Sequence, residues 1–251
     1  MPDKPSPQGA QAALRAIRLL KLFTAEQPEL RLGEICVRAG LNKTTTHRLL
    51  QALCSESMLE KSAVNGCYRL GPALMALGIQ ALSSNDLRLR ARPLLEQLAT
   101  ESGETATLEV PIDDTMLILD EVTSSHFVGA GGNVGTRWPM HATSTGKVLI
   151  AFEDQGLDRL TNELLSLTSK TITERGQLEA QLPGIRERGF AETVDELEDG
   201  FSGVATVIRG GMGQVLGALS ICGPTQRLSA TRRASLGASL CTSAAQLQPN
   251  F

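Results

Sequence analysis

The sequence predicts an α+β protein with a small helical domain that ends in a β-hairpin, a linker helix, and a larger α/β domain with a mainly antiparallel sheet. In the first 72 residues, apolar side chains recur at helical intervals and an Asn-Gly pair follows them. From about residue 105, apolar side chains instead alternate along short segments that lie between further helices. A chain of 251 residues is long enough for two such domains.

The first two helices follow from spacing and from the residues that end them. Residues 1–9 contain three prolines and predict a disordered arm. A helix over about residues 12–23 is predicted by four apolar residues at helical spacing: Leu14, Ile17, Leu20 and Phe23. A second helix fits residues 32–39, because Gly40 can end it in a left-handed conformation.

The third helix and the hairpin complete the small domain. Asn42 is a good N-cap for a helix that runs to about Cys54. Asn65-Gly66 predicts the turn of a hairpin, because both residues tolerate positive φ. A linker helix is then expected from residue 72 to about 83, followed by a break in which Asn85 caps the next helix.

The larger domain is expected to alternate helices and strands. The expected helices are residues 87–100, 144–152, 157–165, 174–188 (capped by Thr173 and ended by Gly189) and 229–247. The expected strands are residues 105–111, 116–122, 126–130, 190–194, 203–209 and 214–222. The domains are therefore expected at residues 10–72 and 86–251, with the linker helix over 73–85.

The charge of the chain is uneven. Residues 1–72 contain ten Lys/Arg and six Asp/Glu, a net charge of +4, whereas residues 73–251 contain fourteen and twenty-one, a net charge of −7. A basic N-terminal third suggests a polyanion as its partner, although chance variation of a few charges would also produce the difference.

Composition points to the cytoplasm and to no cofactor or metal. No apolar run approaches the ~18 residues of a membrane span, and the N-terminus lacks the apolar core of a signal peptide. The five cysteines are scattered and lack C-x-x-C spacing, so reduced thiols are expected rather than disulfides or a zinc site.

The predicted third helix has a polar face that suits a DNA major groove. At about 100° per residue, Leu49, Leu50 and Leu53 face the core. Thr46 lies on the same buried side, where its hydroxyl can bond back to the Asn42 carbonyl. The expected DNA-binding residues of the helix are Lys43, Thr44, Thr45, His47, Arg48 and Gln51.

A solvated face of an ordinary core helix would also be polar. The glycine turn, the preceding helix, the following hairpin and the charge difference together favour a winged helix-turn-helix that binds double-stranded DNA.

Several ordered motifs resemble the IclR family of bacterial transcriptional regulators. RLGEICVRAGLNKTTTHRLL, residues 31–50, resembles the DNA-binding half of that family, and YRLG, residues 68–71, resembles the end of its wing. WPMHATSTGK, residues 138–147, is similar to the family segment PLHATAxGK. Four further motifs follow in the family's order: RGFA (residues 188–191), DE (195–196), GVA (203–205) and LGALSICGP (216–224). The resemblance therefore extends from about residue 11 to 246.

The resemblance implies a wing residue, Arg69, at the DNA, and a GAF-like effector-binding domain that holds a small carboxylate or aromatic acid. Free N–H groups at the start of the helix with Ser144, Thr145 and Gly146 would favour a carboxylate. Ser220 and Cys222 alternate with apolar residues and point to one face of a strand, which by resemblance is the pocket face.

Further pocket residues are expected at Arg137 as a countercharge, Glu196 or Asp195 as an acceptor, and Thr206 on the floor. Trp138 could line the pocket or fill the core, and we favour the core.

Enzyme motifs are incomplete in this sequence. STGK lacks the spacing of a phosphate loop, GAGGNVG does not connect a strand to a helix, and GFSG lacks the second spacing of a nucleophile elbow. DELED, residues 195–199, is interpreted as a solvated acidic loop rather than an acid/base cluster.

We therefore expect a regulator and no enzyme, acting as a homodimer or as a tetramer of two dimers. Two alternatives stay open: a ligand-independent DNA-binding protein and an enzyme with an accessory DNA module.

Overall fold

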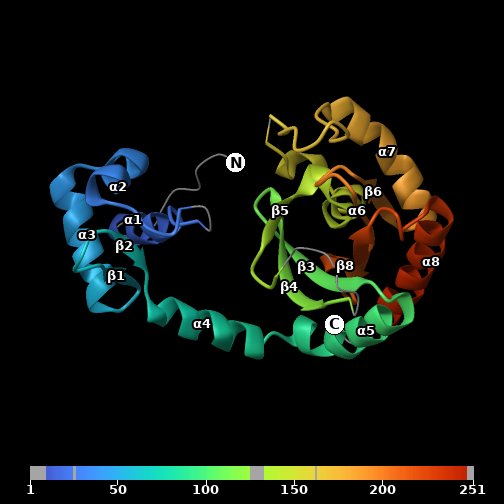
Figure 1. The fold of residues 1–251 in the computed structure, drawn as a ribbon, viewed down its shortest axis with the longest axis horizontal. Helices are drawn as coiled ribbons and strands as arrows, with labels where there is room; N and C mark the ends of the chain where they lie inside the picture. Colours follow the sequence, from blue (N-terminus) through green and yellow to red (C-terminus); the bar gives the residue numbers. More distant parts are fainter. Residues whose placement is uncertain (1–9, 25–26, 125–132, 162, 248–251) are drawn as a thin grey trace. The chain divides into compact units, whose positions relative to one another are not determined.

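The structure is a computed structural model that describes residues 10–24, 27–124, 133–161 and 163–247 (Figure 1). The chain forms two compact units, Met1–Ser84 and Asn85–Phe251. Within the described residues, no helix is both long and apolar enough to cross a membrane.

The first unit is a winged helix-turn-helix followed by one further helix. Its elements are α1 (Gln11–Leu20), α2 (Leu32–Ala39), α3 (Lys43–Ser55), β1 (Leu59–Lys61), β2 (Tyr68–Leu70) and α4 (Pro72–Ser83). Gly40, with φ of 62°, ends α2 as expected. The core contains Leu19, Phe23, Leu30, Ile35, Leu50, Leu59 and Tyr68. These residues come from α1, α2, α3, both strands and the segment between α1 and α2, so the core fixes α3 against α1, α2 and the hairpin.

Helix α4 buries none of its side chains. Its apolar residues Met75, Leu77 and Ile79 are 65%, 51% and 65% exposed. Such exposure of a whole apolar helix is unusual on the surface of a soluble monomer.

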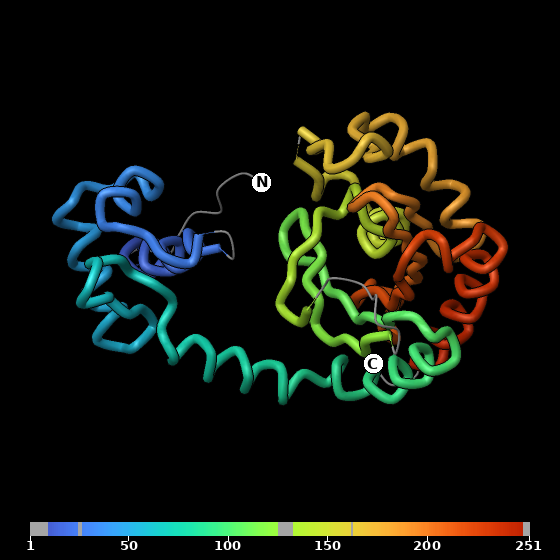
Figure 2. Tube along the Cα trace, viewed as in Figure 1, coloured from blue at the N-terminus to red at the C-terminus, as the bar shows by residue number. Residues whose placement is uncertain are grey.

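The second unit is built on a six-stranded antiparallel sheet in the order β5-β4-β3-β8-β7-β6. Its strands are β3 (Thr105–Ile112), β4 (Thr115–Val122), β5 (Arg137–Pro139), β6 (Ala191–Val194), β7 (Phe201–Arg209) and β8 (Val215–Pro224). In Figure 2 the orange-red segment of β8 lies beside the green segment of β3, and Ser220 pairs with Thr107 in that register.

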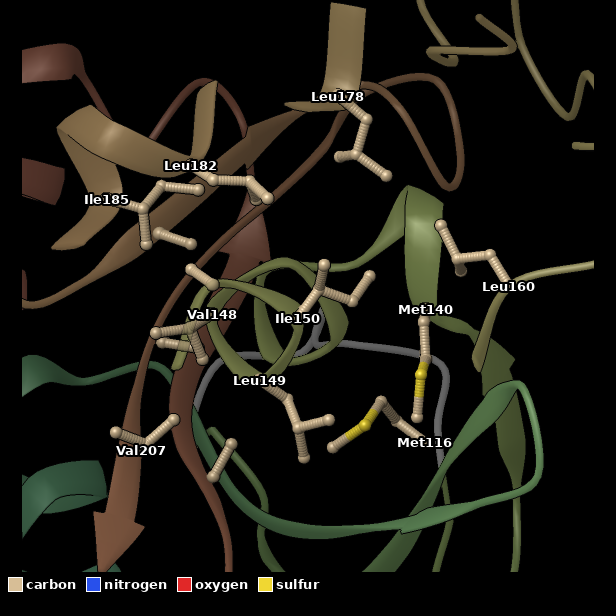
Figure 3. Packing of buried hydrophobic residues seen from close by; sticks show 14 of the residues in the cluster. Met116, Met140, Val148, Leu149, Ile150, Leu160, Leu178, Leu182, Ile185 and Val207 are labelled. Atoms are coloured by element: carbon tan, nitrogen blue, oxygen red, sulfur yellow. The ribbon is translucent and has the colours of Figure 1, made fainter. Parts of the chain in front are cut away.

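Helices cover the two faces of this sheet. Helices α5 (Asp86–Ser102) and α8 (Ala230–Leu247) contact one face, whereas α6 (Ser144–Phe152) packs between the sheet and α7 (Arg175–Arg188) on the other. Figure 3 shows Val148, Leu149 and Ile150 of α6 at the centre of this core, with side chains from α7, from the sheet and from the segments on either side of α6 around them. Both faces are thus occupied, which leaves polar positions of the sheet either paired or facing an internal cavity.

Two sequence-based expectations in this unit are wrong. Residues 157–165 do not form a helix: a short 3₁₀ turn, Gly156–Arg159, is followed by extended backbone at Leu160. There the Thr161 hydroxyl donates to the Glu163 carbonyl, a local bond that competes with helix formation. Glu174, not Thr173, is the N-cap of α7, and it forms no side-chain cap bond. The strand expected at residues 126–130 lies outside the described residues.

Candidate nucleic-acid interface and effector cavity

Helix α3 begins at a well-formed cap. The Asn42 Oδ1 accepts a hydrogen bond from the Thr45 N–H at 2.8 Å, as the sequence predicts. Thr46 is fully buried, and its hydroxyl donates to the Asn42 carbonyl at 3.0 Å, which confirms the role expected for it. Packing of Leu50 and Thr46 therefore sets the rotation of α3, and with it the direction of the remaining side chains.

The outward face of α3 is polar and contains no carboxylate. Lys43, Thr44, Arg48 and Gln51 are exposed, and Thr45 and His47 at its edges are half-buried. Side chains of this kind are those that bind phosphates and the edges of bases. The structure therefore brings together, on one helix face, all six residues that the sequence nominated there.

Arg69 lies on the wing and is ion-paired. Its Nε and Nη2 donate to Glu60 Oε2 at 2.9 and 2.7 Å across the hairpin. Residues 62–67 form a longer loop than the two-residue turn that Asn65-Gly66 suggests, with Gly66 at φ of 70°. A DNA phosphate would have to compete with Glu60 for this guanidinium.

The second unit contains a cavity of about 60 Å³ between the sheet and the N-terminus of α6. Its residues come from all six strands, from the start of α6 and from the loop before β7. They are Thr107, Glu109, Ile118, Glu121, Trp138, Ala142, Thr143, Ser144, Thr145, Thr193, Leu197, Glu198, Phe201, Gly203, Ser220 and Cys222. The walls are mixed, with hydroxyl and carboxyl groups beside two aromatic rings.

A buried carboxyl group joins the sheet to α6. Glu109 Oε2 accepts from the Thr145 hydroxyl at 2.7 Å, and Oε1 accepts from the Thr107 hydroxyl at 2.8 Å. Thr107 Oγ1 also lies 2.7 Å from Ser220 Oγ. Burial raises the pKa of Glu109 despite both hydrogen bonds.

A second carboxyl group stands nearby with a free oxygen. Glu121 Oε2 is buried and forms no hydrogen bond within the part of the chain that is described. Burial, with smaller contributions from the charges of Glu109 and Asp120, raises the pKa of Glu121 to about 7. Burial also raises the pKa of the Cys222 thiol, so this side chain is uncharged at neutral pH.

Half of the sequence-predicted effector residues line this cavity. Ser144, Thr145, Ser220 and Cys222 do so, and so does Trp138, which we expected in the core. The N-terminus of α6 is formed as expected, because the Thr143 hydroxyl accepts from the Gly146 N–H at 3.1 Å.

The structure places the other four elsewhere. Gly146 packs on the backbone of Met140, where an added Cβ would lie 2.2 Å from the carbonyl oxygen. Arg137 donates to the Thr115 hydroxyl and the Ile112 carbonyl at 2.9 and 3.1 Å, outside the cavity wall. Thr206 points to the opposite face of β7, where it donates to the Gly189 carbonyl at 2.9 Å.

Glu196 is bound by a buried lysine instead of facing a ligand. Lys147 Nζ lies 2.5 Å from Glu196 Oε2 and 3.1 Å from Gln181 Oε1, and the Lys147 side chain is fully buried. Asp195 is ion-paired with Lys170 and accepts from the Thr225 hydroxyl. The loop 195–199 is therefore anchored at its first two residues, which corrects its interpretation as a freely solvated acidic loop.

Sequence reasoning missed Glu109 and Glu121. A signal was present in TATLEVP, residues 105–111, where Thr105, Thr107 and Glu109 alternate with apolar residues. In a sheet covered by helices on both faces, such a polar row must border an internal polar space. The number of covered faces, however, is not visible in the strand itself.

Comparisons with known proteins agree with the fold and with the order of its two units. The family model described as "Bacterial transcriptional regulator IclR C-terminal" matches residues 79–248, and "IclR helix-turn-helix domain" matches residues 12–63. The Glycerol operon regulatory protein of Streptomyces griseus is 33% identical over 219 residues, which are 87% of this chain and 86% of that protein.

Solved structures extend this likeness to three dimensions. An IclR transcriptional regulator from Alicyclobacillus acidocaldarius is 28% identical with a TM-score of 0.81, and the match covers 95% of this chain and 97% of that one. An IclR homologue from Microbacterium hydrocarbonoxydans, complexed with 4-hydroxybenzoate, is 26% identical with a TM-score of 0.75 and coverages of 95% and 98%. The families and relatives are transcriptional regulators and not enzymes. With both of its units matched in order, this chain belongs to the IclR family of bacterial transcriptional regulators.

Proposed function

We propose that the outward face of α3 reads an operator sequence in double-stranded DNA, and that a small effector in the α6 cavity alters operator affinity. The observation that carries the first part is the carboxylate-free polar face of α3, held in place by buried Thr46 and Leu50. Thr44, Arg48 and Gln51 would contact base edges, while Lys43 and the half-buried Thr45 and His47 would contact phosphates. The protein would act in the cytoplasm, where its DNA target lies.

A homodimer would account for the apolar surface of α4. Pairing of this helix with the same helix of a second copy would cover Met75, Leu77 and Ile79, which are otherwise exposed to water. A two-fold dimer would present two α3 helices to half-sites about 34 Å apart, one turn of DNA. A tetramer would follow from a second pairing of such dimers.

The proposal that a small effector alters operator affinity rests on the cavity beside α6. A ligand that contacts Ser144 and Thr145 on one side and Ser220 on the other would bridge α6 and the sheet. Such a ligand changes DNA affinity only if it binds the DNA-competent and the DNA-free conformations with different affinities. The N-terminus of α6 and the relative complexed with 4-hydroxybenzoate favour an acid, whereas the carboxyl groups of the wall favour a hydrogen-bond donor.

Binding to promoter DNA tests the α3 part. Arg48→Ala should weaken binding to the DNA upstream of the protein's own gene by about tenfold or more, and should relax the sequence preference at the base pair that Arg48 contacts. Arg175→Ala is the control, because it removes the same charge from α7 in the other unit. Equal affinity of wild type and Arg48→Ala would contradict the assignment of this face.

A further inference from the structure

The α6 cavity offers acceptors and negative charge to a ligand. Three of its wall residues carry carboxyl groups (Glu109, Glu121 and Glu198), and none of the described wall residues is Lys, Arg or His. Lys147 of α6 is already engaged by Glu196 at 2.5 Å, and Arg88 and Arg92 of α5 are engaged by Asp120 at 3.3 and 3.1 Å. A ligand carboxylate would therefore find no ion-pair partner on the described wall, and it would meet a like charge wherever one of these carboxyl groups is ionised.

The positive end of α6 is partly used as well. The Thr145 hydroxyl in its first turn donates to Glu109 Oε2, so a carboxyl group of the protein already lies at this helix terminus. A helix terminus carries about half a unit charge, which does not balance the carboxyl groups of Glu109 and Glu121 together. The amides of Ser144 and Thr145 remain as donors, but they face a site that is acidic overall.

Glu121 is the group that a ligand would satisfy. Its Oε2 is buried without a hydrogen-bond partner among the described residues, a state that costs free energy unless a donor arrives. Glu109, fully buried beside it in the wall, has accepted only two hydrogen bonds, whereas a carboxylate can accept about four. Both groups thus have capacity for donors from a bound molecule.

We propose that the cavity selects a small, non-anionic ligand that donates hydrogen bonds to Glu109 and Glu121, either an amine or a polyol. This inference rests on the proposed role of the cavity as the effector site and names its ligand class. The volume of about 60 Å³ limits the ligand to a few heavy atoms, and Trp138 and Phe201 supply the apolar wall against which its carbon skeleton would lie. An ammonium group placed over either aromatic ring would gain further from cation–π attraction.

The charge state of the wall supports the same class. Glu121 loses its proton as the pH rises through its pKa of about 7, with Glu109, Asp120 and the uncharged Cys222 around it. An anionic ligand would bind more weakly above that pH, because the wall then gains a negative charge. An amine would bind more tightly there, and a polyol would keep acceptors for its hydroxyl groups.

Calorimetry on the full chain at pH 8 tests the proposal with three sets of compounds of three to five carbons: primary amines, polyols and carboxylic acids. We expect a heat of binding from the amines or from the polyols. A response to amines identifies the ligand as a cation, and a response to polyols identifies it as a neutral molecule. Glu121→Gln should weaken that binding at least tenfold, whereas Glu179→Gln, an exposed carboxyl group on α7, should leave it unchanged. Glu109→Gln should act in the same direction, and retained DNA binding verifies that each variant is folded.

The outcomes separate this proposal from the proposed function. Binding of acids alone at pH 8, with affinity kept or raised in Glu121→Gln, would overturn the ligand class and leave the cavity as the effector site. Gly203→Ala tests whether the responding compound binds in the cavity at all, because the added Cβ would lie 3.0 Å from Ser144 Oγ, which lines the cavity. If Gly203→Ala binds the responding compound as wild type does, or if no set gives heat, both the ligand class and the cavity assignment are overturned.

Discussion

Lys147 and Glu196 form an ion pair of 2.5 Å inside the second unit, residues 85–251, which we call the effector unit. The Lys147 side chain has no exposed surface there. Burial lowers the pKa of Lys147 and raises that of Glu196, and their mutual attraction opposes both shifts. The pair ties α6 to the loop that precedes β7, and that loop supplies Leu197 and Glu198 to the cavity wall.

Removing one member of this pair should be more damaging than removing both charges. Lys147→Met leaves Glu196 buried without its cation, which should lower the free energy of unfolding by about 3–5 kcal/mol. The double variant Lys147→Met/Glu196→Gln should recover much of this loss. Urea unfolding followed by circular dichroism measures both variants, and equal loss in the single and double variants would show that the charge pair is not the cause.

Gly146 is required for packing rather than for ligand binding. An added Cβ would lie 2.2 Å from the Met140 carbonyl oxygen and 2.3 Å from its Cα, and backbone atoms cannot move aside cheaply. Gly146→Ala should therefore destabilise the effector unit by about 3 kcal/mol or more. Gly176→Ala is a matched control in α7, because its added Cβ meets nothing within 4 Å. That variant should be neutral or gain about 0.5–1 kcal/mol in a thermal unfolding experiment.

The three consecutive threonines of α3 should separate by role. Thr46→Val removes the hydroxyl hydrogen bond, but the Asn42 carbonyl still accepts from the backbone N–H of residue 46 at 3.0 Å, so stability should change by about 1 kcal/mol or less. DNA affinity should not change either. Thr44→Ala should leave the unfolding temperature unaltered and weaken operator binding several-fold, because Thr44 is exposed on the proposed DNA face. The reverse pattern in unfolding and DNA-binding assays would mean that α3 is rotated relative to this assignment.

Stability of the effector unit should fall as the pH rises from about 4.5 to 7. Burial raises the pKa of Glu121 to about 7 in the folded state, so folding favours its protonated form. This contribution is fully present below the unfolded pKa of 4.5 and is lost as the pH rises through about 7. Thermal unfolding at several pH values measures the trend, which should be weaker in Glu121→Gln. An identical pH dependence in this variant would exclude Glu121 as its origin.

The DNA-binding unit was predictable because its signals are local. The Asn42 cap, the Gly40 turn and the leucine spacing all lie within about fifteen residues of α3, and they determine both its boundaries and its buried face. The bond from Thr46 to the Asn42 carbonyl follows from that helix geometry alone. The ion pair of Arg69 with Glu60 was less predictable, because it depends on the hairpin register.

The cavity was less predictable because its walls join strands that are distant in the sequence. Thr107 and Ser220 become neighbours only through the pairing of β3 with β8, and the alternation in each strand does not reveal that partner. Thr206 faces away from the cavity because of its position in the β7 register, which the sequence pattern of that strand did not resolve. Lys147 lies in the WPMHATSTGK motif, but its burial against Glu196 depends on the tertiary fold and is not visible in that motif.

Selection of bound fragments from native genomic DNA, followed by sequencing, determines whether α3 reads an operator sequence. The wild-type chain should enrich a two-fold symmetric motif with half-sites about 10 base pairs apart, and Arg48→Ala, with an unchanged unfolding temperature, should lose that enrichment. Enrichment of the same motif by the folded Arg48→Ala variant, or no enrichment by the wild type, would contradict the assignment of α3 as the DNA-reading helix.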